Sequence, residues 1–211
     1  MSVIIQASQV IQTIEHAAQS LLANADYFTA LDQEVGDGDL GITMAKAANA
    51  LLEYIQTKPI SDIGSWLASA GMAVNRAAPS TMGTLLSTAL MRAGKEVKEK
   101  EELSLSDLSN MFKAADKGIQ ERGQAHLGDK TIVDSLHPAA EAFASTLENG
   151  DGLAEAGAQA LAAAKNGRDA VTPQRNKIGR ASWVGERTEG KIDPGCAVCV
   201  VLINAIVQEQ K

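Results

Sequence analysis

The chain has few cysteines, few aromatic residues and no apolar run long enough to cross a membrane. It has two cysteines, Cys196 and Cys199, and aromatic residues make up 3% of its 211 residues. Two thiols three positions apart cannot build the disulfide framework of a small secreted protein. The N-terminal segment carries no basic stretch ahead of a continuous apolar run, so we expect no signal peptide. These absences predict a cytoplasmic protein without a membrane span.

A basic surface is also missing. The formal net charge is −7, and no cluster of lysines and arginines stands out in the sequence. This balance argues against nucleic acid and anionic membranes as main partners. A hydrophobic content of 45% is enough for an ordinary globular core. Because no Pro/Ser-rich linker divides the sequence, we expect residues 1–211 to form one domain.

Almost every segment has the periodicity of an amphipathic helix. The first helix is predicted by apolar residues at steps of three and four: Val3, Ile4, Val10, Ile11, Ile14, Ala17, Leu21 and Leu22. Further helices are expected at 23–35, 42–56, 62–77, 81–97 and 151–166, after residues 104 and 131, and from residue 194. About eight antiparallel up-and-down helices predict an all-α bundle or barrel.

Side chains that cap helices mark several of the expected starts. Ser104 with Asp107, and Thr131 with Asp134, have the spacing of a capping box. Asp193 is a candidate N-cap for the last helix. Between the helices, glycine-bearing loops at 32–41, 77–83, 122–131 and 178–195 are less regular than bundle connections usually are. We therefore expect a functional site at one end of the bundle.

The loop that reads "GDGDLG" gathers three carboxylates, Asp32, Asp37 and Asp39. Carboxylates this close repel one another unless a cation lies between them. Oxygen ligands without a nearby histidine or cysteine suit a hard ion such as Mg²⁺. An EF-hand is excluded, because Ala48 stands at the twelfth position, where a glutamate is needed. An ordinary acidic, solvated turn remains the alternative.

The same loop matches the dinucleotide pattern G-x-G-x-x-G through Gly36, Gly38 and Gly41. That pattern requires a preceding strand, whereas residues 23–35 are predicted to be helical. Asp37 and Asp39 would also repel a bare pyrophosphate. The sequence therefore does not predict a dinucleotide-binding fold.

Two other loops carry groups that suit phosphate. Ser80 or Thr81 can cap the next helix, and a helix N-terminus binds anions, although an ordinary cap explains these residues equally well. Arg180 and Arg187 are candidate phosphate ligands, with surface ion pairs as the alternative. We expect Trp183 to pack against the protein. The two cysteines are expected to be buried on one helix face.

Three motifs together resemble one family. "LDQEVGDGDLGITM", "GDKTIVDSLHPAAEAF" and "GRASWVGERTEGKIDPG" are similar to motifs of the nucleotide-binding L subunit of dihydroxyacetone kinase. The same module forms the C-terminal domain of single-chain, ATP-dependent kinases. The resemblance covers essentially the whole chain and implies a barrel of eight antiparallel helices.

The resemblance also implies roles for individual residues. Asp32, Asp37 and Asp39 correspond to aspartates that bind two Mg²⁺ ions bridging to the phosphates of ADP or ATP. Nucleotide contacts are implied for Leu40, Gly41, Thr43, Ser80, Thr81, Met82, Gly123, Ile132, Arg180, Asp193 and Gly195. No catalytic side chain is implied beyond this metal–nucleotide site.

The implied function is half of an enzyme. The chain would present Mg-ADP or Mg-ATP for phosphoryl transfer to dihydroxyacetone, or to a related ketose such as erythrulose, held by a separate sugar-binding kinase subunit. Two phosphoryl donors stay open: a phosphotransferase-system phosphocarrier subunit acting on bound ADP, or free ATP. A regulator that binds a transcription factor according to its nucleotide state is an alternative of another class. A homodimer is also left open.

Overall fold

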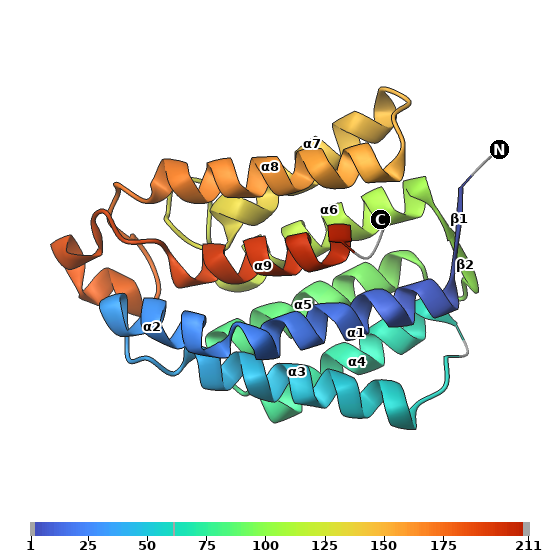
Figure 1. The fold of residues 1–211 in the computed structure, drawn as a ribbon, viewed down its shortest axis with the longest axis horizontal. Helices are drawn as coiled ribbons and strands as arrows, with labels where there is room; N and C mark the ends of the chain where they lie inside the picture. The colour runs from blue at the N-terminus through green and yellow to red at the C-terminus, as the bar shows by residue number, and fades with distance from the viewer. Residues whose placement is uncertain (1–2, 61, 209–211) are drawn as a thin grey trace.

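The computed structural model describes residues 3–60 and 62–208, which are largely helical (Figure 1). Residues 1–2, 61 and 209–211 of the predicted domain lie outside this description. The helices are α1 (Ala7–Ala23), α2 (Ala25–Val35), α3 (Leu40–Thr57), α4 (Ile63–Ala77), α5 (Thr81–Glu96), α6 (Leu105–Gly123), α7 (Val133–Glu148), α8 (Leu153–Val171) and α9 (Pro194–Gln208). Two 3₁₀ helices, η1 (Arg180–Trp183) and η2 (Gly185–Thr188), lie between α8 and α9.

Eight of these helices close into a barrel. The order of contacts around it is α1, α3, α4, α5, α6, α7, α8 and α9, and α9 packs back against α1. Neighbours in the barrel run in opposite directions along its long axis (Figure 1). The short helix α2 packs against α3 and α9. The predicted all-α barrel of antiparallel helices is therefore confirmed. None of the described helices is both long enough and apolar enough to traverse a bilayer.

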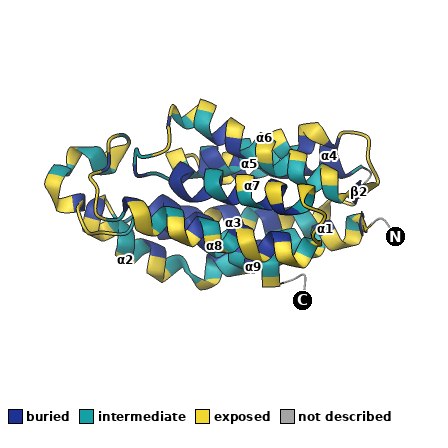
Figure 2. Cartoon of the chain, turned by 90° about the horizontal axis from the view of Figure 1, so that it is seen from above, coloured by how far each residue is buried: buried dark blue, intermediate teal, exposed yellow. Residues whose placement is uncertain are grey.

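Helix α9 forms the shared wall of the hydrophobic core. Its Ala197 and Val198 belong to a cluster with α1, α3 and α4, whereas Cys199 and Val200 belong to a second cluster with α5 to α8. Cys196 and Cys199 are free and buried, as predicted, and burial raises the pKa of both thiols. Buried residues face the interior of the barrel along most of its length (Figure 2).

The helix caps largely follow the sequence. Ser104 and Asp107 form the predicted capping box of α6, and Asp193 accepts a hydrogen bond from Cys196 N at 2.9 Å at the start of α9. The prediction for α7 is displaced, because that helix begins at Val133 after Ile132. Asp134 still bonds back to Thr131 N, at 2.7 Å.

Two predicted helix boundaries are wrong. Residues Ile4–Gln6 form strand β1, which pairs antiparallel with β2 (Glu102–Ser104), so Ile4 lies opposite Ser104 rather than in the first helix. Helix α8 runs to Val171, five residues past the predicted 166. Gly167 permits this extension, because any side chain there would overlap the Asp134 carbonyl of α7.

Candidate functional site

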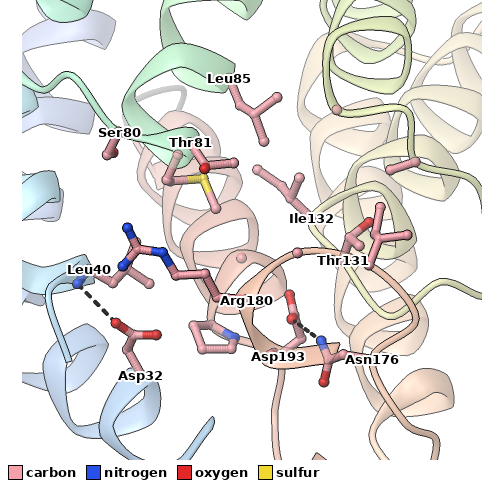
Figure 3. A pocket seen from close by; sticks show the side chains of 18 of the residues that line it. Asp32, Leu40, Ser80, Thr81, Leu85, Thr131, Ile132, Asn176, Arg180 and Asp193 are labelled. Atoms are coloured by element: carbon pink, nitrogen blue, oxygen red, sulfur yellow. Dashed lines mark hydrogen bonds between the residues drawn. The ribbon is translucent and has the colours of Figure 1, made fainter. Parts of the chain in front are cut away.

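A cleft of about 230 Å³ brings the predicted site residues together (Figure 3). Of the residues predicted to bind metal or nucleotide, all but Gly41 and Arg187 line it. Its walls come from α2, α3, α5, α6 and α9, the loop before α7, and the segment between α8 and α9. The predicted residues in the lining are Asp32, Asp37, Asp39, Leu40, Thr43, Ser80, Thr81, Met82, Gly123, Ile132, Arg180, Asp193 and Gly195.

The three predicted aspartates converge at one side of this cleft. One carboxylate oxygen from each of Asp32, Asp37 and Asp39 lies within 4.8 Å of the others. Asp32 lies in the last turn of α2 and accepts a hydrogen bond from Leu40 N at 3.2 Å, across the loop between α2 and α3. Gly38 has a φ of +77°, a conformation that favours glycine. The donor set is oxygen only and half exposed, and it fits a hard divalent cation.

Arg180 is the positive charge that faces these aspartates. Its guanidinium pairs with Asp37 and lies 3.5 Å from Asp39. Figure 3 shows the side chain extending from the segment between α8 and α9 toward Leu40. All three side chains of this ion cluster are at least half exposed, so the pairs add little stability. The arginine is therefore free to exchange one anionic partner for another.

The N-terminus of α5 provides backbone donors beside the acids. Ser80 is its N-cap and accepts a hydrogen bond from Gly83 N at 3.1 Å. The first backbone N–H groups of a helix have no partner within it, and the helix dipole favours an anion there. Thr81 and Met82, in this first turn, line the cleft. This side of the cleft therefore combines carboxylates, a guanidinium and free N–H groups.

The other part of the cleft is apolar. Leu85 from α5 and Ile119 from α6 face Ile132 and Val133 at the start of α7, and all four are buried. Gly123 ends α6 beside them and leaves room, since a Cβ there would make only ordinary contacts. Apolar walls with polar groups at one end are typical of small-ligand sites.

Sequence analysis missed two buried polar residues in the lining, Lys130 and Asn176. Lys130 is 0% exposed, and its ammonium donates to the carbonyls of Thr172, Gln174 and Thr188 at 2.9, 2.8 and 2.6 Å. Asn176 Nδ2 donates to the Lys130 carbonyl and to Asp193. A lysine between polar residues gives no sequence signal of burial, because lysines are seldom fully buried.

Burial alters the charge balance of this network. It raises the pKa of Asp193 to about 6, although hydrogen bonds from Cys196 N and Asn176 oppose that rise. It also lowers the pKa of Lys130, against the attraction of Asp193. The network joins the loop before α7, the segment after α8 and the start of α9, so it fixes three walls of the cleft together.

Three predicted residues lie elsewhere than the sequence suggested. Trp183 is 93% exposed, so the expectation that it packs is wrong. It stands on η1, in a segment that turns away from the barrel. Arg187 does not line the cleft. Gly41 is buried against α2, where a Cβ would overlap the Ala25 carbonyl and Thr29 Oγ1, so its place in the fold is steric.

The comparison with known proteins gives matches over nearly the whole chain. The family model described as "DAK2 domain" matches residues 34–208. The chain is 27% identical to the "PEP-dependent dihydroxyacetone kinase, ADP-binding subunit DhaL" of Escherichia coli, over 97% of each chain. It is 32% identical to the corresponding subunit of dihydroxyacetone kinase 2 of Listeria innocua, over 88% of this chain and 87% of that protein. These relatives are kinase subunits.

The fold is also found in a solved structure. The dihydroxyacetone kinase of C. freundii, in complex with AMP-PNP and Mg²⁺, matches with a TM-score of 0.74 and 21% identity. The match covers 99% of this chain and 35% of that one, so this chain spans about a third of the larger protein. With a family match that covers most of the sequence, the chain belongs to the DAK2 domain family.

Proposed function

We propose that this chain is the nucleotide-binding subunit of a dihydroxyacetone kinase, built as one domain over residues 1–211. The observation that carries the proposal is the meeting of the aspartate triad (Asp32, Asp37 and Asp39), Arg180 and the α5 N-terminus at one side of an apolar cleft. End-to-end similarity to ADP-binding kinase subunits supports the same function. Two buried free thiols agree with a reducing cytoplasm.

Each group in the cleft has a chemical part in this proposal. The aspartate triad would hold Mg²⁺, two ions in our proposal, and bound Mg²⁺ would neutralise phosphate charge and activate the transferred phosphoryl group. Arg180 leaves the acids and binds a phosphate, for which its planar fork is suited. The α5 N-terminus donates backbone N–H groups to the phosphates, and the apolar walls around Ile132 hold the base. Phosphoryl transfer depends mainly on such positioning and charge neutralisation.

Bound ADP is the form of nucleotide that we propose. The E. coli and L. innocua relatives, which align with this chain over most of their length, are named PEP-dependent and ADP-binding. Human triokinase/FMN cyclase is 26% identical, but this chain covers only 34% of it. The pattern favours a separate subunit whose ADP is rephosphorylated by a phosphocarrier protein, over a single chain that consumes free ATP.

The first test is cooperative binding of ADP and Mg²⁺. Thermal melts with ADP alone, Mg²⁺ alone and both together should show a much larger shift for the pair, because each ligand compensates the charge of the other. A ligand at a hundred times its Kd stabilises by about 2.7 kcal/mol. If the pair shifts the midpoint no more than the better single ligand, the metal–nucleotide site is not as we propose.

The second test asks whether the chain is half of an enzyme. Purified protein with Mg²⁺ and ATP should form no dihydroxyacetone phosphate or erythrulose phosphate, and adding the sugar-binding subunit should start turnover. The same assay with a phosphocarrier protein and PEP separates the two donors. Rapid sugar phosphate formation by the chain alone would contradict the half-enzyme proposal. Nucleotide binding without turnover on any ketose would favour the regulatory alternative.

A further inference from the structure

Lys130 makes contacts unlike those of the other lysines for which contacts are described. Lys177 and Lys191, in the segment between α8 and α9, are exposed and pair with the carboxylates of Asp129 and Glu34 at 3.8 and 2.8 Å, respectively. Lys130 is fully buried, and its ammonium donates to three backbone carbonyls and to no carboxylate. An ammonium has three protons, so this arrangement uses all of them.

The three carbonyls belong to the two ends of one segment. We call residues 172–189 the strap, because they leave the barrel after α8 and return before α9 (Figure 1). Thr172 and Gln174 stand at its start and Thr188 at its end, while Gly190 N donates to Thr172 O at 2.9 Å. The ammonium of Lys130 therefore joins the ends of the strap, and we call this junction the neck.

A second contact ties the neck to the rest of the cleft. Asn176 N donates to Thr188 Oγ1 at 3.2 Å, across the neck, and Asn176 Nδ2 donates to the Lys130 carbonyl at 2.6 Å. Lys130 also has a φ of +60°, which is uncommon for a residue other than glycine. Such a backbone persists only where the surrounding structure holds it. The residue is held from both its side chain and its backbone.

Among the described contacts, Arg180 is the only charged side chain of the strap that reaches the aspartate triad. Arg180 lies between the two ends that Lys130 joins, and its guanidinium meets Asp37 and Asp39. These ion pairs are exposed and weak, so they cannot fix the strap by themselves. Lys130 and Thr188 are buried, and removing the ammonium would take one hydrogen bond from each of the three carbonyls, although Thr172 O and Thr188 O would keep Gly190 N and Lys191 N as donors. The position of Arg180 therefore depends on the neck.

We propose that Lys130 is a positioning residue that sets the place of Arg180 by closing the neck of the strap. The proposal rests on the function proposed above, in which Arg180 binds a phosphate of the nucleotide. Lys130 itself acts through backbone carbonyls and needs no contact with the phosphates. It lies outside the residues predicted from the sequence to bind metal or nucleotide.

A double-mutant cycle tests this coupling. The Kd of Mg-ADP would be measured by calorimetry for the wild type, Lys130→Met, Arg180→Ala and the double variant. We expect each single change to raise the Kd about tenfold. The Kd of the double variant should not exceed that of the weaker-binding single variant, because the two changes remove the same contact. A double variant weakened by the product of the two factors would overturn the proposal, as would a Lys130→Met protein that binds like the wild type.

A second readout needs no ligand. Trp183 lies on the strap and is 93% exposed, whereas Trp66 is 3% exposed. In a Trp66→Phe background, the steady-state fluorescence anisotropy of Trp183 should fall in Lys130→Met, because the strap moves more freely. Lys191→Met is the matched control, since it removes an exposed lysine next to the strap, and it should leave the anisotropy unchanged. Unchanged anisotropy in a folded Lys130→Met protein would also overturn the proposal.

The outcomes separate this proposal from the proposed function. If the wild type does not bind Mg-ADP, the function fails, while the anisotropy still reports on Lys130. If Arg180→Ala binds normally, the role of Arg180 fails instead. Should Lys130→Met not fold, Thr188→Val removes the hydroxyl that accepts from Asn176 N and donates to the Gly185 carbonyl. That variant should lower the anisotropy less and show the same non-additivity with Arg180→Ala, and additive losses would count against the proposal.

Discussion

The aspartate triad and the neck line the same cleft, and both gather polar groups, yet they balance charge in opposite ways. The triad holds three like charges that are largely exposed, with one loosely held arginine against them. The neck, with Asp193 beside it, buries the Lys130 ammonium and the Asp193 carboxylate and surrounds them with hydrogen bonds. The triad, which must receive a charged ligand, keeps an excess of negative charge. The neck, which must hold its shape, has its charged groups surrounded by hydrogen-bond partners.

The largest expected effect comes from Asp37→Asn, which breaks the triad. With the sugar-binding subunit present, phosphoryl transfer should fall about 10³-fold, since clamps on transferring phosphoryl groups are worth at least that much. The unfolding free energy of the free chain should stay within about 0.5 kcal/mol, because a repulsion and an exposed ion pair are lost together. Enzyme assays and chemical denaturation would measure the two quantities.

Glu34→Gln is the matched control for that experiment. Glu34 lies on the same helix as Asp32 and pairs with Lys191, but it is not one of the three converging carboxylates. Its removal should leave phosphoryl transfer unchanged. Loss of the helical signal in the free Asp37→Asn protein would mean that Asp37 is needed for the fold. It would contradict the contrast between the triad and the neck.

The next largest effect is a pH dependence on the neck side, tested by Asp193→Asn. The folded pKa of Asp193 is about 6, above the ordinary 3.8, so the folded chain binds this proton more tightly than the unfolded chain. The stability this contributes is present below pH 3.8 and is lost as the pH rises through 6. Unfolding free energies of wild type minus variant should therefore fall by about 2 kcal/mol between pH 4 and pH 7.

The exposed Asp151 supplies the control for this pH series. Asp151→Asn makes the same change of side chain at an exposed position just before α8, so the pH series of the two variants can be compared directly. The difference in unfolding free energy between wild type and Asp193→Asn could instead rise with pH. Burial would then not dominate the pKa of Asp193, and the neck would not be the compensated site that we describe.

The smallest of the three effects separates two glycines that the sequence placed in the same role. Gly41→Ala should cost about 2 kcal/mol of stability, because its methyl group overlaps α2. Gly123→Ala should change stability by less than about 0.5 kcal/mol, since its Cβ would lie 3.6 Å from Leu85 Cδ2. It should weaken ADP binding roughly tenfold, as one methyl group too many does in an apolar pocket. Thermal melts and calorimetry on both variants would show which glycine is needed for packing and which for nucleotide binding.

Local chemistry explains why much of the fold could be predicted. Ser104 and Asp193 cap helices through residues three positions away, so their signals lie within a short stretch of sequence. Strand β1 was missed because Ile4 pairs with Ser104, a hundred positions away, and three residues carry too little alternation to stand out from a helical stripe.

The residues of the site divide in the same way, into those with a local sequence signal and those held by distant partners. The aspartates are recognisable because their clustering is a local conflict of charge, and the motifs around them are specific. Lys130 escapes notice because its partners, Thr172 to Thr188, lie more than forty positions away and are backbone atoms with no side-chain signature. Trp183 was misplaced because an aromatic side chain usually packs, and sequence does not show that the strap leaves the barrel.

The contact between α1 and α9 has a consequence for how the chain folds during synthesis. Helix α1 packs against α3 on one side and against α9 on the other (Figure 1). The face of α1 that α9 covers has no partner until the ribosome has made residue 194 and those after it. Seven helices of the barrel, α1 and α3 to α8, can therefore assemble before the ring closes, and α9, the most apolar of the described helices, docks last, as the seam between the two halves of the core.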